Sequence, residues 1–271
     1  MKHLRTITAA LMLLFSASAA QAEDADFAKM LDGLMPKLSA EKIADRHGAQ
    51  KTLLSTCLKL GAPGKEKQRA EACSVIAKKL GSNMAVPARV WLLKQLEFIG
   101  RAESVDAVAA LLGEKDTLVR DAARRALANN PEKAAGAKLL ARMPSEKDAK
   151  FKAALINSLG YRAEASSVSA LSTELANKDQ TVAIAAARAL GKIATPDAAK
   201  SLSAAREKAA GELKLWIGDS LLLCADDLKK QGKSAEAIAL YKQLSGPKES
   251  KHVRVAALQG LLQAGKKVGG K

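Results

Sequence analysis

The stretch Val182-Ala-Ile-Ala-Ala-Ala-Arg-Ala-Leu190 is the third copy of a unit that the chain repeats. The earlier copies are Val119-Arg-Asp-Ala-Ala-Arg-Arg-Ala-Leu127 and Phe151-Lys-Ala-Ala-Leu-Ile-Asn-Ser-Leu159, and the three starts lie 32 and then 31 residues apart. Repetition at this period is typical of stacked helical arrays. The sequence therefore predicts a repeat fold over residues 116–191.

Apolar and small residues recur at fixed places in each copy. Counted from the first residue as position 0, they fall at positions 0, 3, 4, 7 and 8, with one serine as the exception, and these positions form one face of an α-helix. An aspartate stands three residues before each copy, at 116, 148 and 179, where its carboxylate can cap a helix N-terminus. Gly160 and Gly191 directly follow the last two copies, and we expect them to be left-handed C-caps.

A second amphipathic segment precedes each copy, at residues 105–112, 134–140 and 168–175. Each unit is therefore predicted to be a helix A, a short turn and a helix B. One such pair cannot bury its apolar stripe alone, whereas stacked pairs can. The predicted fold class is all-α, a right-handed α-α superhelix (solenoid) of stacked antiparallel helix pairs.

The pattern extends beyond the three clear copies. Further B helices are predicted to start at Leu213 and Val253. Residues 91–100 are predicted to be an earlier B helix, in which alignment of Gly100 with Gly160 places Lys94 and Gln95 in buried positions.

These units resemble bacterial HEAT repeats of about thirty residues. The resemblance rests on Val119-Arg120 before an Ala-rich helix and on Ala189-Leu190-Gly191-Lys-Ile after Val182, and it covers residues 87–197 well and 214–265 more loosely. It implies the fold, and it implies that the B helices line a concave face. It does not imply one function, because such arrays serve many tasks.

Residues 225–247 also resemble a tetratricopeptide unit. The residues that carry this resemblance are Gln231-Gly232-Lys233, Glu236-Ala237-Ile238 and Leu240-Tyr241. The step from Leu213 to Val253 is longer than the other repeats, so the pattern departs from HEAT repeats there.

The first residues are typical of a cleavable signal peptide. A basic head precedes an uncharged segment at 6–15, and small residues end in Ala20-Gln21-Ala22. The apolar segment is too short to cross a bilayer, so we expect cleavage after Ala22 and export to a bacterial periplasm or the outside. Loss of Lys2 and Arg5 would reduce the formal net charge from +16 to +14.

The predicted organisation has five parts. They are a signal peptide at 1–22, an N-terminal helical cap at 23–86, HEAT-like repeats at 87–211, C-terminal HEAT/TPR-like helices at 212–265 and a disordered tail at 266–271.

The three cysteines leave one question open. Cys57 and Cys73 flank the turn at 61–64 symmetrically, so they are either a disulfide pair of a helical hairpin or two small buried residues. Cys224 lies in an apolar run and is predicted to be a buried thiol.

The sequence offers no usual catalytic constellation. Its histidines are only at 3, 47 and 252, and it contains neither Cys-x-x-Cys nor Gly-x-Ser-x-Gly. We therefore expect no enzyme activity, no cofactor and no metal site.

Basic residues recur at positions 1, 5 and 6 of the B helices, which the apolar face leaves toward the exposed side. The candidate partner-binding residues are Arg124, Arg125, Arg188, Lys152, Lys214 and Arg254. The alternative for position 1, which Arg120 also occupies, is a ladder of ion pairs with the capping aspartates. Trp216 is predicted to pack in the core, and Trp91 either there or as a surface anchor.

The favoured function is an exported, non-catalytic HEAT-repeat scaffold that mediates protein–protein interaction through its helical groove. The alternative is a basic binder of an extracellular or envelope polyanion, motivated by the net charge. A third, less favoured interpretation is an enzyme of the lyase type, because bilin lyases and alkylpurine DNA glycosylases use HEAT-like arrays. The expected partner is a protein or peptide, with no membrane span and no specific nucleic-acid recognition.

Overall fold

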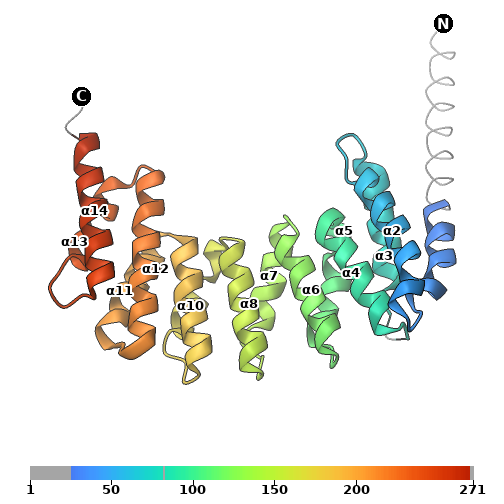
Figure 1. Ribbon diagram of the computed structural model, residues 1–271, viewed down its shortest axis with the longest axis horizontal. Helices are drawn as coiled ribbons and strands as arrows, with labels where there is room; N and C mark the ends of the chain where they lie inside the picture. The colour runs from blue at the N-terminus through green and yellow to red at the C-terminus, as the bar shows by residue number, and fades with distance from the viewer. Residues whose placement is uncertain (1–25, 82, 269–271) are drawn as a thin grey trace, which may run out of the picture. The chain divides into compact units, whose positions relative to one another are not determined.

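The computed structural model describes residues 26–81 and 83–268 (Figure 1). In those residues the regular elements are all helices and no strand occurs, so the all-α repeat fold is confirmed. The chain divides into two compact units, Met1–Ala135 and Gly136–Lys271, and each is described by itself. The predicted signal peptide at 1–22 lies outside the described residues.

The first unit is a series of helices joined by short turns. They are residues 26–38, α2 (Ile43–Leu60), α3 (Glu66–Lys79), α4 (Val86–Ile99), α5 (Ala102–Ala110), the 3-10 turn η1 (Leu111–Gly113) and α6 (Thr117–Asn129). The B helices α4 and α6 pack against each other, with α5 and η1 as the helix A between them in the sequence. α7 (Lys133–Arg142) crosses the boundary between the units.

The second unit continues the same alternation (Figure 1). Its elements are α8 (Ala149–Tyr161), the 3-10 turn η2 (Ala165–Ser167), α9 (Val168–Glu174), α10 (Gln180–Ile193), α11 (Pro196–Lys208), α12 (Gly211–Lys230), α13 (Ser234–Leu244) and α14 (Lys251–Val268). The B helices α8, α10 and α12 lie side by side in that order, while α9 and α11 contact each other and α10. α14 continues into the predicted tail at 266–271, as lysine favours helix, and residues 269–271 lie outside the described chain.

The predicted N-caps are confirmed, and so is the apolar stripe of α6 and α10. The carboxylates of Asp116, Asp148 and Asp179 each accept hydrogen bonds from two backbone N–H groups in the first turn of α6, α8 and α10. Positions 0, 3, 4, 7 and 8 of α6 and α10 are all buried. Local sequence therefore sets both the start of each B helix and the face that it buries.

The register predicted for α4 is wrong. Lys94 is exposed, whereas Gln95 is buried. The burial pattern makes Ala88 position 0, which lies 31 residues before Val119 and fits the repeat. Alignment on Gly100 fails because this glycine follows the end of α4 instead of lying inside the helix.

Gly160 and Gly191 are not the C-caps that the sequence predicts. Both lie inside helices, because α8 continues to Tyr161 and α10 to Ile193. A Cβ built on Gly160 would lie 2.6 Å from Ala189 Cα, and one built on Gly191 would lie 3.0 Å from Ser220 Cα. In each case position 9 of one B helix meets position 7 of the next. These glycines let consecutive B helices approach backbone to backbone.

A buried arginine ties the start of α12 to its neighbours. Arg206 of α11 is 5% exposed, forms an ion pair with Glu249 and donates to the Lys214 carbonyl. Its guanidinium also occupies the space beside Gly218. Burial lowers the pKa of Arg206, and the charge of Asp219 opposes that shift. This cluster connects α11, α12 and the loop before α14.

The close approach of α8 and α10 gives the first prediction. Gly160→Ala should lower the free energy of unfolding by about 1–3 kcal/mol, because the new methyl group would collide with the Ala189 backbone. This loss outweighs the ~1 kcal/mol by which alanine exceeds glycine in helix propensity. Urea unfolding followed by circular dichroism measures the change.

The control is Gly48→Ala in α2, an exposed glycine at which a Cβ would have no atom within 4 Å apart from the nearby backbone of its own helix. It should raise the free energy of unfolding by about 0.5–1 kcal/mol. Equal effects of the two substitutions would contradict the contact role of Gly160.

A second prediction concerns the actual end of α8. Ala163 is exposed and has φ 50°, a left-handed conformation that disfavours a Cβ. Ala163→Gly should therefore raise the free energy of unfolding by about 1 kcal/mol. Ala204→Gly, at an exposed site inside α11, should lower it by a similar amount in the same urea experiment. A loss of stability in Ala163→Gly would disprove the assigned strain.

Candidate functional site

The exposed face of the B helices in the second unit is defined by position 6. Asn157, Arg188, Asp219 and Gln259 hold this position in α8, α10, α12 and α14, and all are exposed. The row is therefore mixed in charge and not a basic ridge. Position 5, which we expected to be exposed, is buried in α8, α10 and α12 because it faces the neighbouring helices.

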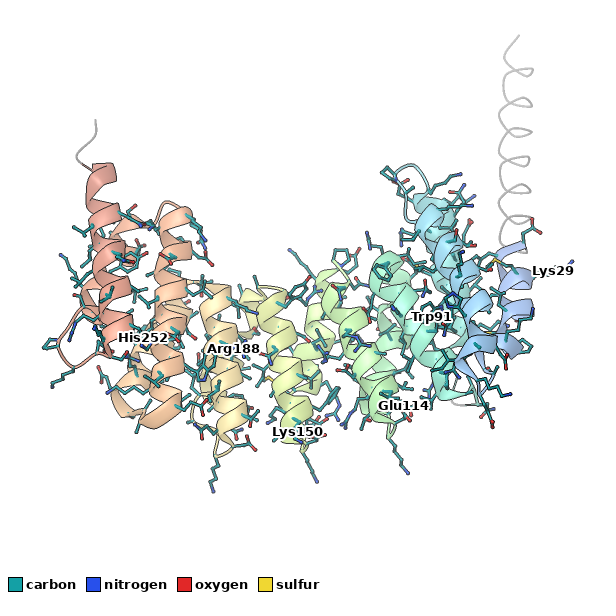
Figure 2. All side chains as sticks on the ribbon, viewed as in Figure 1. Lys29, Trp91, Glu114, Lys150, Arg188 and His252 are labelled. Atoms are coloured by element: carbon teal, nitrogen blue, oxygen red, sulfur yellow. The ribbon has the colours of Figure 1, made fainter. Side chains whose placement is uncertain are left out.

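Arg188 and Trp216 form the centre of this face (Figure 2, where Arg188 is labelled on α10). The guanidinium carbon of Arg188 lies 4.9 Å from the centroid of the Trp216 ring. The indole Nε1–H donates to Glu212 Oε1 at 3.2 Å, and Gln180 Nε2 donates to Glu212 Oε2 at 3.1 Å. Trp216 is thus held at its edge by a carboxylate and covered on one face by a cation.

These residues line a surface pocket of ≈ 340 Å³. Its walls come from α8, α10 and α12, and they are Ala153, Asn157, Gln180, Thr181, Ile184, Ala185, Arg188, Glu212 and Trp216. Small apolar side chains form part of the wall. Asn157 and Arg188 make no hydrogen bond or ion pair within the described part of the chain, so their polar edges can serve a ligand.

The prediction that Trp216 packs in the core is wrong. Trp216 is only partly buried, although it holds the apolar position 3 of α12. The reason is that position 3 lies at the edge of the buried stripe, and the flanking side chain at position 6 of α10 is a long arginine that covers it. Asn157, Gln180 and Glu212 were not predicted as site residues. Asn157 could have been found from its equivalence with Arg188 at position 6.

Three of the predicted partner-binding residues are engaged in ion pairs. Arg124 pairs with Asp121 at 2.8 Å, and Arg125 pairs with Asp121 at 2.6 Å and with Glu97 at 3.0 Å. The expectation that both arginines lack an ion-pair partner within the chain is wrong, because Asp121 lies one turn earlier on the same helix. Lys152 pairs with Glu174 at 3.1 Å and not with the capping Asp148.

Lys214 and Arg254 are half-buried and lie outside the pocket. Of the six predicted residues, Arg188 alone lines it. The structure therefore groups Arg188 with residues that the sequence did not select.

The first unit carries a similar pair. Trp91 and Lys94 hold positions 3 and 6 of α4 once its register is corrected, and Lys94 Nζ lies 4.7 Å from the Trp91 ring centroid. Trp91 is half-buried, and its Nε1 is buried without a hydrogen-bond partner among the described residues. Both tryptophans thus lie at position 3 beneath a cation from position 6.

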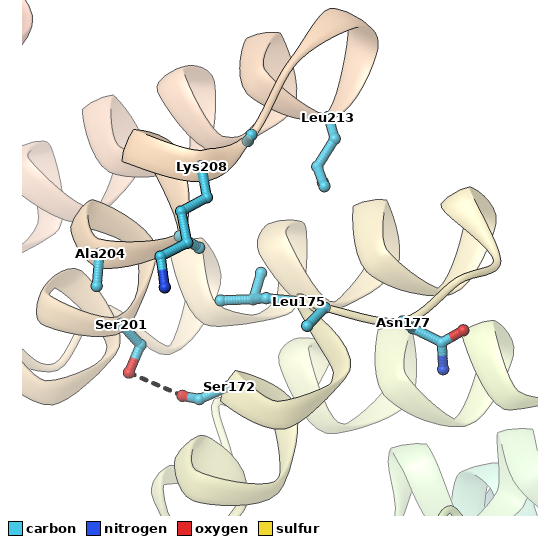
Figure 3. A pocket seen from close by; sticks show the side chains of 10 residues that line it. Ser172, Leu175, Asn177, Ser201, Ala204, Lys208 and Leu213 are labelled. Carbon is cyan, nitrogen blue, oxygen red and sulfur yellow. Dashed lines mark hydrogen bonds between the residues drawn. The ribbon is translucent and has the colours of Figure 1, made fainter.

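A larger pocket of ≈ 580 Å³ lies between α9, α11 and the start of α12 (Figure 3). Ser172 and Ser201 hydrogen-bond each other across it at 2.8 Å, and alanines form much of the remaining wall. Among the described residues that line it, only Lys208 is charged. The hydroxyl groups are already paired, so this pocket offers a ligand few polar contacts.

The described residues contain no group of three or more His, Cys, Asp or Glu that could hold a metal ion. The described helices include none with the length and apolarity needed to cross a membrane.

All three cysteines are free and buried, which answers the open disulfide question. Burial raises the pKa of the Cys57, Cys73 and Cys224 thiols to about 12, because the thiolate loses its hydration. The negative charge of Glu103 adds to this effect at Cys73.

Part of the chain matches a known family. Residues 136–221 match the family model of HEAT repeats. This part of the chain therefore carries HEAT repeats, and the resemblance to HEAT-repeat α-solenoids is confirmed. No curated protein matches the sequence.

Several solved structures are similar at low identity. The complex of CpcE and CpcF of phycocyanin lyase from Nostoc sp. PCC7120 matches with 17% identity and a TM-score of 0.43, over 85% of this chain and 86% of that chain. A designed armadillo repeat protein matches with 19% identity and a TM-score of 0.35, over 86% and 98%. Human deoxyhypusine hydroxylase in complex with glycerol matches with 13% identity and a TM-score of 0.33, over 92% and 99%. At these identities and TM-scores the similarities carry no argument about activity or partners.

The buried thiols give a third prediction. Because their pKa is about 12, almost no thiolate exists at pH 8, and the folded protein should resist iodoacetamide. Mass spectrometry should find all three cysteines modified after denaturation without reductant. Modification of Cys224 alone would reveal a disulfide between the other two and contradict the free thiols.

Proposed function

We propose that this protein is an exported, non-catalytic HEAT-repeat scaffold that binds a protein or peptide partner on the position-6 face of its B helices. The observation that carries the proposal is the Arg188–Trp216 stack at the pocket between α8, α10 and α12. Export rests on the sequence of residues 1–22, and the non-catalytic role rests on the missing catalytic motifs.

The stack has the properties of a binding hot spot. Tryptophan and arginine are the residues that most often dominate protein interfaces, especially where they are held in place before binding. Glu212 fixes the indole edge at 3.2 Å, so Trp216 does not have to be ordered by a partner. A guanidinium stacked on a ring keeps its N–H edge available for a carboxylate. The pair can therefore bind an acidic side chain beside an apolar one.

The remaining polar groups fit an extended peptide. The carboxamide of Asn157 is exposed and has both a donor and an acceptor, which match a peptide bond. Glu212 makes the pocket mixed in charge. Such a mixture favours a peptide with an acidic residue over a uniformly charged polymer.

The fourth prediction tests this face with a partner captured in place. A photo-crosslinking residue at Asn157 should trap a protein from the envelope fraction, whereas the same residue at Lys200 on α11 should not. The purified partner should then bind Arg188→Glu or Trp216→Ala about 10-fold or more weakly, as expected for a hot spot. Isothermal titration calorimetry measures the affinity.

Lys200→Glu is the matched control, because Lys200 is an exposed cation on helix A. The affinity of Lys200→Glu for the partner should stay within about 2-fold of the parent's. The free energy of unfolding of Arg188→Glu should change by less than about 1 kcal/mol, because an exposed cation–π pair contributes little more. The proposal that this face binds the partner would be contradicted by equal affinities of Arg188→Glu, Trp216→Ala and Lys200→Glu.

The second candidate function is binding of an envelope or extracellular polyanion. The excess of lysine and arginine, with a sequence pI ≈ 9.8, favours it. In that case affinity for heparin should fall steeply with salt, and Lys200→Glu and Arg188→Glu should weaken it equally. A loss confined to Arg188→Glu supports the peptide site instead.

A further inference from the structure

The B helices α8 and α10 follow a packing rule that can be read from positions 5 and 9. In α8 these positions are Ile156 and Gly160, and in α10 they are Ala187 and Gly191. All four are buried. Position 9 of each helix touches the next B helix, so this side of a B helix is the one that receives its successor.

Positions 5 and 9 are exposed in α14, where they are Leu258 (46% exposed) and Leu262 (68% exposed). Val255, one turn before Leu258 at position 2, is also 44% exposed. Their spacing of three and four residues places them on one stripe of the helix. The opposite side of α14 is buried, with Val253 and Ala257 at 0% exposure. Among the described residues, no helix covers the stripe.

We propose that the stripe of Val255, Leu258 and Leu262 is a docking surface for an acidic amphipathic helix of a partner protein. The helical form of the partner follows from the position of the stripe, because the equivalent side of α8 and α10 receives a helix. Its apolar face should carry residues three and four apart, which fit between the three side chains.

The charge of the partner follows from the composition of α14. Its sequence, KHVRVAALQGLLQAGKKV, contains lysine, arginine and histidine but no acidic residue. A partner helix with glutamate or aspartate beside its apolar stripe would therefore meet opposite charge at the N-terminal end of α14, where Lys251 and Arg254 lie. Charged rims of this kind set specificity and association rate.

Charge also disfavours a second copy of this helix as the occupant. Two α14 helices paired through their stripes would bring basic residues together in either direction, since neither contains an acid. Like charges placed across an interface oppose association. An acidic helix satisfies both the apolar stripe and its rim.

A designed peptide tests the proposal directly. The probe is a fluorescently labelled 18-residue helix with leucine repeated at positions i, i+3, i+4 and i+7 and glutamate on both sides of this leucine stripe. Fluorescence anisotropy measures its binding to the full-length protein. Leu258→Ser with Leu262→Ser should weaken binding at least 10-fold. Because both side chains are exposed, the variant should keep the circular dichroism spectrum of the parent.

Two controls separate the apolar and the charged contributions. Gln259→Ser, at an exposed site on the same helix, should leave the affinity within about 2-fold. A probe with lysine in place of glutamate should bind at least 10-fold more weakly. Arg188→Glu should not change probe binding, so that failure at this stripe and failure of the Arg188–Trp216 face remain distinguishable.

Other occupants have their own signatures, and each would overturn the proposal. Concentration-dependent dimers that disappear in the double serine variant would assign the stripe to a second copy. Binding to anionic lipid vesicles but not to the acidic probe would assign it to a membrane surface. Equal affinity of the parent and the double variant for the probe would show that the stripe binds no helix.

Discussion

The structure of the second unit depends on the close approach of consecutive B helices at glycine. Gly160 lies against Ala189 and Gly191 against Ser220, at distances where a side-chain carbon at either glycine would collide with its neighbour. This contact fixes the rotation of each helix about its axis. In α8 and α10, positions 5 and 9 must then face the next helix, and position 6 must face outward. The exposed row of Asn157 and Arg188 is thus a consequence of backbone packing.

The sequence predicted the features that depend on the helix itself. The capping aspartates and the stripe at positions 0, 3, 4, 7 and 8 are local, because a first-turn N–H and an amphipathic face need no neighbour to be recognised. The role of Gly160 could not be found in this way. A glycine after an apolar stripe has the same sequence signature whether it ends a helix or touches another one, and only the neighbouring backbone separates the two.

Contacts between repeats are equally hard to recognise from the sequence for charged residues. Arg124 and Arg188 both lie beside the apolar stripe of a B helix and look alike in the sequence. In the structure, Arg124 forms an ion pair with Asp121, whereas Arg188 stacks on Trp216. The Asp121–Arg124 pair is within one helix and was available to sequence reasoning. The contact of Arg188 with Trp216 joins different repeats, so it required the stacking register. Exposure alone therefore does not identify a recognition residue; its nearest neighbours do.

A repeat array gives one helix position different physical roles at different places. At position 9, glycine in α8 permits close packing, whereas leucine in α14 leaves an apolar side chain in water. Solvent exposure of several such groups is unfavourable by about 25 cal/mol per Å² of apolar surface. Terminal units of repeat proteins usually avoid it with a polar outer face. The leucines of α14 lie on the side that receives the next B helix in α8 and α10, and the proposed docking surface rests on that equivalence.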